Sequence, residues 1–129
     1  MSRKHFLTFA SVVALVVGSV ALIAPGVLLA SKGIVGNDAA DVWMREVGVV
    51  LVSIGCIAWC IRDHPDSPTM RAFLWGNALL QLLLLPVEIL AFAHGTITNV
   101  SGIIPNSILH VLLGVGFFVN ARAMAMAPR

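Results

Sequence analysis

Charge is scarce in this 129-residue chain, since only 11% of its residues are Asp, Glu, Lys or Arg. Hydrophobic residues make up 59%, and the mean hydropathy is +0.97. A water-soluble domain needs a polar surface that this composition does not supply. The formal net charge of +2 is scattered, with no basic run longer than Arg3-Lys4-His5, which excludes a nucleic-acid-binding surface.

Catalytic and metal-binding motifs are missing as well. There is no phosphate loop, no H-E-x-x-H, no Asp-rich metal motif, and no set of nucleophile and base. The only cysteines, Cys56 and Cys60, are four residues apart in an apolar run, which favours two small buried side chains over a redox pair. The histidines fall at different depths, which argues against a bis-histidine haem. We therefore expect no catalytic residue, no metal and no cofactor.

Long apolar runs dominate what is present. Four segments have the roughly 20 residues that a helix needs to cross a bilayer. They are Phe6–Ala30, Val42–Ile61, Ala72–Phe92 and Ile103–Ala121. The first run is too long for a cleaved secretory signal. Short loops make consecutive helices antiparallel neighbours, so residues 1–129 are predicted to form one all-α transmembrane domain, an antiparallel four-helix bundle.

Loop charge predicts the orientation, because Lys and Arg are retained on the cytoplasmic side. With the N-terminus inside, the inner set has six cations and the outer set two. The inner set is Arg3, Lys4, Arg62, Arg71, Arg122 and Arg129, and the outer set is Lys32 and Arg45. Both termini are therefore expected in the cytoplasm. Prolines at 25 and 86, and glycines at 55 and 114, recur at matching places and suggest two repeated helical hairpins.

Small residues are expected to bring the helices together, because lipid supplies no hydrophobic force between them. The first span carries Gly18 in a stripe of alanines, and the second carries Gly48 and Gly55 on one face. Pro25 and Pro86 are expected to bend their helices near the outer ends. A gap between helices is therefore expected in the outer half of the bundle.

Ionisable residues inside a membrane are costly, so each is a candidate for function. Counting 1.5 Å per residue from the inner arginines, Glu88 and Arg45 both fall roughly 5 Å below the outer boundary and form a candidate ion pair. His110 falls about two turns away, and Gln81 shares the polar stripe of Glu88. We predict a ligand-binding site formed by Arg45, Glu88, His110 and Gln81.

Two interpretations of this group remain open. The Arg45–Glu88 pair is either a structural staple between helices or a polar anchor at the mouth of an apolar cavity. In the second case Arg45 holds a ligand headgroup or carboxylate, while Glu88 and His110 provide orientation or proton exchange.

Arg45, Gly48, Gly55, Trp59 and Arg62 form the pattern R-x-x-G, then G, then W-x-x-R. This pattern resembles that of small uncharacterised bacterial membrane proteins of the DUF4345 kind. The resemblance covers the first half of the chain. It implies a four-helix fold in a bacterial inner membrane, and it carries over no catalytic residue.

The loops between the spans are short, so no domain outside the membrane is expected that could process a soluble substrate. This limits the functional hypotheses. The leading hypothesis is a non-enzymatic protein that binds a membrane lipid or a hydrophobic small molecule, or that serves as a membrane subunit of a larger complex. An alternative is a small oligomeric transporter or proton-coupled carrier in which Glu88 and His110 titrate. A third is a membrane enzyme of lipid or quinone chemistry. A homo-oligomer fits the first two.

Overall fold

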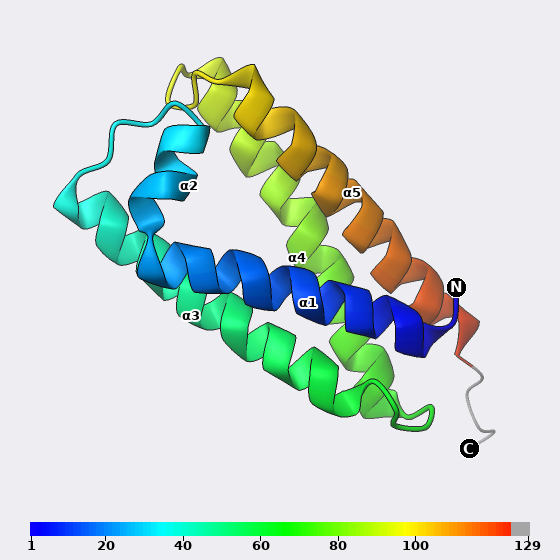
Figure 1. Ribbon diagram of the computed structural model, residues 1–129. Helices are drawn as coiled ribbons and strands as arrows, with labels where there is room; N and C mark the ends of the chain where they lie inside the picture. The colour runs from blue at the N-terminus through cyan, green and yellow to red at the C-terminus, as the bar shows by residue number, and fades with distance from the viewer. Residues whose placement is uncertain (125–129) are drawn as a thin grey trace.

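The computed structural model describes residues 1–124, and α-helix is the only regular secondary structure over that range. The helices are α1 (Arg3–Ile23), α2 (Pro25–Ser31), α3 (Asp38–Ile61), α4 (Pro68–Ala93) and α5 (Val100–Ala123) (Figure 1). All except α2 are long and apolar enough to cross a membrane, which makes the chain an integral membrane protein. The predicted all-α class with four spanning helices is confirmed. Arg129, counted in the inner set of charges, lies outside the described residues.

Polar side chains cap the N-termini of three of the long helices. Ser2 accepts a hydrogen bond from the backbone N–H of His5 ahead of α1, and Asn37 caps α3. Ser67 caps α4 directly before Pro68, whose missing N–H costs nothing in a first helical turn. Each cap pairs a backbone N–H that has no carbonyl partner at a helix start, so the loops fix where the spans begin.

The first predicted span is wrong in one respect, because it is not a single helix from Phe6 to Ala30. Ala24 leaves the helical region with φ −133° and ψ 60°, and α2 begins at Pro25. A proline has no N–H for the helix and disfavours helical geometry in the residue before it. The chain therefore turns at Ala24, and α2 heads toward the loop between α4 and α5 (Figure 1).

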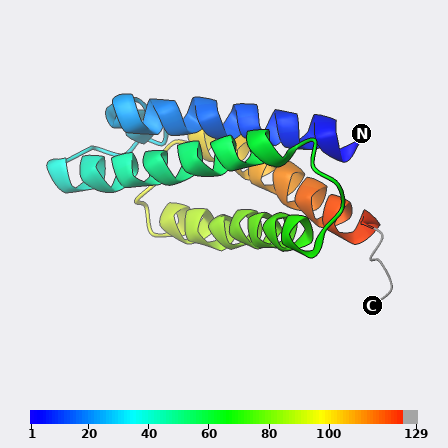
Figure 2. The ribbon, with the colours of Figure 1, turned by 90° about the horizontal axis from the view of Figure 1, so that it is seen from below.

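The helices associate as two antiparallel pairs. Helix α1 packs along α3, and α4 packs along α5, with few contacts from one pair to the other (Figure 2). In the first pair the backbones touch at glycines: a Cβ on Gly48 would lie 2.7 Å from the Leu22 nitrogen and 2.8 Å from the Gly18 oxygen. The Ser11 hydroxyl donates to the Gly55 carbonyl at 2.7 Å in the same contact. The prediction that small residues join these helices is confirmed.

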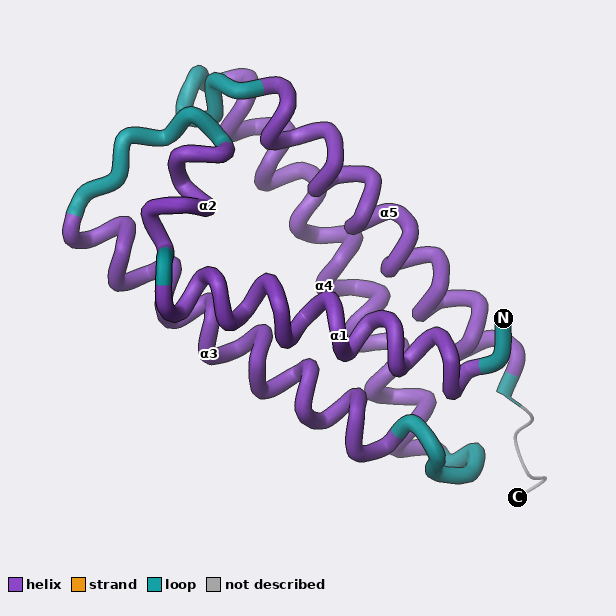
Figure 3. Tube along the Cα trace, in the orientation of Figure 1, coloured by secondary structure: helices purple, strands orange, loops and turns teal. Residues whose placement is uncertain are grey.

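Contacts between the two pairs are concentrated at the ends of the molecule. At the end that holds the N-terminus, the Phe6 ring meets Phe117 edge-on with centroids 4.8 Å apart and covers Gly116. At the opposite end, the loops shown in Figure 3 join, because the N–H groups of Thr98 and Asn99 both donate to the Lys32 carbonyl at 3.1 Å. The two pairs are thus fastened at both ends and separated along the middle.

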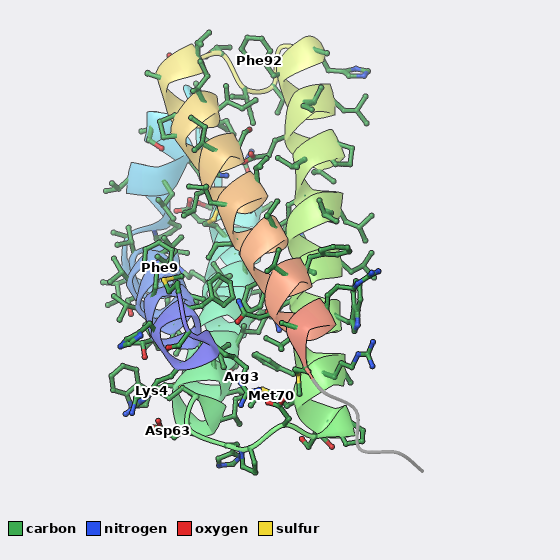
Figure 4. The ribbon with its side chains drawn as sticks, turned by 90° about the vertical axis from the view of Figure 1, so that its right-hand side faces the viewer. Arg3, Lys4, Phe9, Asp63, Met70 and Phe92 are labelled. Atoms are coloured by element: carbon green, nitrogen blue, oxygen red, sulfur yellow. The ribbon has the colours of Figure 1, made fainter. Side chains whose placement is uncertain are left out.

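Charged side chains gather at the end that holds the N-terminus. Arg3 pairs with Asp66 and donates to the His64 carbonyl at 2.6 Å, while the Lys4 ammonium lies 2.6 Å from the Asp63 carboxylate (Figure 4). These bonds join the start of α1 to the loop between α3 and α4. The hydrogen bond from Lys4 holds the pKa of Asp63 below its ordinary value of 3.8.

Removing that bond has a measurable consequence. In Lys4→Met, the pKa of Asp63 is expected to rise toward 3.8, as followed by NMR titration of its carboxyl carbon. Because the folded-state pKa is depressed, the contact contributes above the pKa of the unfolded chain and is lost as pH falls through the folded value. Arg71→Met is the control, since it removes a cation at the start of α4 that does not contribute to the lowered pKa of Asp63. An unchanged titration in Lys4→Met would contradict the contact.

Candidate functional site

A cleft lies between the two helix pairs where they separate. Its cavity volume is about 70 Å³, and it opens to the exterior. The walls from α1 and α3 are wholly apolar. They consist of Ala10, Val13, Ala14, Val17, Leu51, Ile54 and Ala58. The opposite walls add Asn77 and Gln81 from α4, and Asn106 and His110 from α5, to further apolar residues. The cleft therefore has one apolar side and one side that carries hydrogen-bonding groups.

Glu88 forms the outer end of a polar network beside this cleft. Its side chain is 8% exposed and is paired with the Lys32 ammonium, which comes from the C-terminal end of α2. Asn106 donates to one carboxylate oxygen, and the Ser107 hydroxyl approaches the other at 3.4 Å. A buried carboxylate is tolerated when its charge and lone pairs are met in this way.

His110 and Gln81 extend the network toward the cleft. The Asn106 amide nitrogen lies 3.0 Å from His110 Nε2, and His110 Nδ1 lies 2.6 Å from the Gln81 oxygen. A carboxylate only accepts hydrogen bonds, so the Asn106 atom that faces both Glu88 and His110 is the NH2 group. His110 Nε2 is then the acceptor, and Nδ1–H donates to Gln81 Oε1. This chain of bonds assigns the neutral Nδ1–H tautomer and leaves the Gln81 NH2 group unused.

The predicted Arg45–Glu88 ion pair is not formed. Arg45 is exposed, and its guanidinium donates to the Leu22 carbonyl at 2.6 Å. Because α1 ends at Ile23, that carbonyl belongs to the last helical turn, whose carbonyls lack partners within the helix. Arg45 therefore caps α1 from α3, and it takes no part in the network. Of the predicted site residues, the structure brings together Gln81, Glu88 and His110.

Sequence reasoning missed Lys32 as the partner of Glu88. The sequence places Lys32 in an outer loop, because it predicts Phe6–Ala30 to be a single helix that Pro25 only bends. The signal that was available is Ala24-Pro25-Gly26, which allows the chain to fold back and carry Lys32 toward α4. Asn106 and Ser107, the other partners of Glu88, are not in the predicted site either.

The chemistry open to the site is that of binding. The carboxylate is surrounded by donors, and the histidine bonds on both nitrogens. Residues 1–124 include no cluster of three His, Cys, Asp or Glu side chains that could hold a metal ion. Cys56 and Cys60 are unpaired, as expected, but both are exposed on α3, so the prediction that they are buried is wrong. The groups free to meet a ligand are the apolar walls and the amides that line the cleft.

Comparison with known family models, curated proteins and solved structures finds no match for this chain. The site is therefore interpreted from its own geometry.

Proposed function

We propose that this integral membrane protein binds a small lipophilic molecule in the cleft between its two helix pairs. The observation that carries the proposal is the division of the cleft into an apolar side, from α1 and α3, and a side with amide and imidazole groups, from α4 and α5. Ligand sites typically combine a mostly apolar lining with a few convergent polar groups. The Lys32–Glu88 network acts as a structural staple that holds the polar wall in place.

We propose further that the protein resides in a bacterial inner membrane with both ends of the described chain in the cytoplasm. The cations at the N-terminal end include Arg3, Lys4 and Arg62, whereas the opposite end holds Lys32 and Arg45. The rule that positive charge stays inside supports this orientation. The bacterial location rests on the resemblance described above.

The alternatives receive less support. A proton-coupled carrier needs a carboxyl group that its cargo can reach, and the Glu88 side chain is only 8% exposed and already contacts Lys32, Asn106 and Ser107. A membrane subunit of a larger complex is compatible with the broad apolar surface of the helices, but no particular face points to a partner. The cleft therefore favours the binding protein.

Filling the cleft should abolish binding. We expect the natural protein to retain added 1-dodecanol in native mass spectrometry, and Ala14→Phe, which places a ring among the apolar lining residues, to lose that retention. Ala72→Phe is the matched control, because Ala72 is exposed on α4 and does not line the cleft. It should keep binding within about twofold, inside the roughly 0.5 kcal/mol typical of surface changes. Equal retention by both variants, each correctly folded, would contradict a ligand in the cleft.

A further inference from the structure

Two amide side chains on α4 face the cleft with unused hydrogen-bonding atoms. Asn77 and Gln81 are each only 7% exposed, and both line the cleft. The Gln81 side-chain oxygen accepts a hydrogen bond from His110, and the Gln81 NH2 group has no partner within residues 1–124. Asn77 donates to the carbonyl of Phe73 in its own helix at 2.9 Å, and its oxygen has no partner in the same range. Buried amides without partners are costly, so these atoms mark a place where a ligand stabilises the protein.

Both unused atoms remain reachable. Among residues 1–124, the one fully covered side-chain nitrogen or oxygen without a partner is Nε of Arg3, at the far end of the molecule. Asn77 and Gln81 are four residues apart and therefore lie on the same face of α4, one turn from each other. A single compact headgroup in the cleft can accept from Gln81 and donate to Asn77.

The depth of this pair restricts the charge of the ligand. Helix α4 runs 26 residues from Pro68 to Ala93, and Gln81 lies at its middle. The two amides are therefore near the mid-depth of the membrane. A charged group at that depth is costly unless a counter-ion meets it. Lys32 is already paired with Glu88, and Arg45 is bound to Leu22 outside the cleft. The hypothesis that Arg45 binds a ligand carboxylate therefore fails, because neither cation is available in the cleft.

We propose that the cleft selects an uncharged amphiphile whose headgroup carries both a hydrogen-bond acceptor and a donor, of the kind found in a primary fatty amide. The ligand carbonyl accepts from the Gln81 NH2 group, and the ligand N–H donates to the Asn77 oxygen. The hydrocarbon tail lies against the apolar walls of α1 and α3. This inference rests on the proposed function, because it names the class of ligand for the same cleft.

The test compares headgroups on one chain length. The full-length protein is placed in lipid nanodiscs containing dodecanamide, sodium dodecanoate or dodecane, and the bound fraction is followed by native mass spectrometry over a titration. We expect dodecanamide to bind about tenfold more tightly than dodecane, since one net hydrogen bond is worth about that factor. Dodecanoate at neutral pH should bind more weakly than the amide.

Two variants connect this preference to the amides. Gln81→Met and Asn77→Leu should each bring dodecanamide close to the affinity of dodecane. Asn120→Leu is the matched control, because Asn120 makes the same bond to its own helix, to the Gly116 carbonyl at 2.8 Å, but does not line the cleft. It should keep the preference. Gln81→Met also removes the partner of His110, whereas Asn77→Leu removes only a bond within α4, so the second variant keeps the test sharp if the first folds poorly.

Each other result overturns the proposal. Equal binding of the amide and dodecane would show that the amides do not recognise the headgroup, and the proposed function would survive without this ligand class. Tighter binding of dodecanoate would show that the ligand is an anion. Binding of none of the probes would overturn the proposed function together with this inference. An unchanged preference in Asn77→Leu and Gln81→Met would place the headgroup elsewhere.

Discussion

Replacing Gly48 by leucine is expected to separate α1 from α3 and to lower the free energy of unfolding by about 3 kcal/mol, the upper end of the usual overpacking range. The reason is that a Cβ at this position meets backbone atoms, the Leu22 nitrogen at 2.7 Å and the Gly18 oxygen at 2.8 Å. Backbone atoms cannot rotate aside as a flexible side chain can. The whole of α1 must then move away, and the bond from Ser11 to the Gly55 carbonyl is lost with it.

Reversible unfolding in mixed detergent measures this loss. Gly76→Leu is the matched control, since a Cβ on Gly76 has nothing within 4 Å and the residue also lies within a long helix. We expect that variant to be neutral or slightly more stable, because leucine favours the helix over glycine by up to about 1 kcal/mol. If Gly48→Leu and Gly76→Leu unfold alike, the close backbone contact is not what holds the first pair together.

The second large effect is expected from Lys32→Met. This change leaves the Glu88 carboxylate buried, with a side chain only 8% exposed and no cation beside it. Removing one partner of a buried ion pair typically destabilises by about 3–5 kcal/mol, and we expect a loss near the lower figure because Lys32 is itself partly exposed. The same unfolding measurement in detergent reports it.

A second substitution distinguishes this loss from general damage to the loop. In the double variant Lys32→Met, Glu88→Gln, the uncompensated charge is gone and the amide oxygen still accepts from Asn106, so most of the stability should return. Arg45→Met should cost no more than about 1 kcal/mol, as a single exposed hydrogen bond does. A loss in Arg45→Met as large as that in Lys32→Met would restore Arg45 as the partner of Glu88.

The spans were predictable because the bilayer imposes one length and one composition on every crossing helix. The four apolar runs were found by counting, and the glycines of the contact between α1 and α3 followed from the need for close backbone approach. The break at Ala24 was only partly predictable. Pro25 was expected to bend a helix, but a bend and a full change of direction have the same signal in the sequence.

The site was harder to predict because the sequence gives the depth of a residue in the membrane but not which helices lie beside one another. Glu88 and Arg45 were placed at one level, yet α3 packs along α1 and makes few contacts with α4. The partner of Glu88 comes from α2, an element that exists only because of the turn at Ala24. Gln81 and His110 were grouped correctly, since both lie on polar stripes of helices that follow each other and so pack as a pair.

The pairing of helices that follow each other in the chain also bears on biosynthesis. Once Ile61 has entered the membrane, α1 and α3 possess every residue of their shared glycine contact, before α4 has been inserted. The second pair can likewise assemble by itself. Phe117 reaches Phe6, and Glu88 reaches Lys32, only after both pairs are inserted. The cleft between the two pairs is thus the last part of the molecule to form, and it exists only in the finished protein.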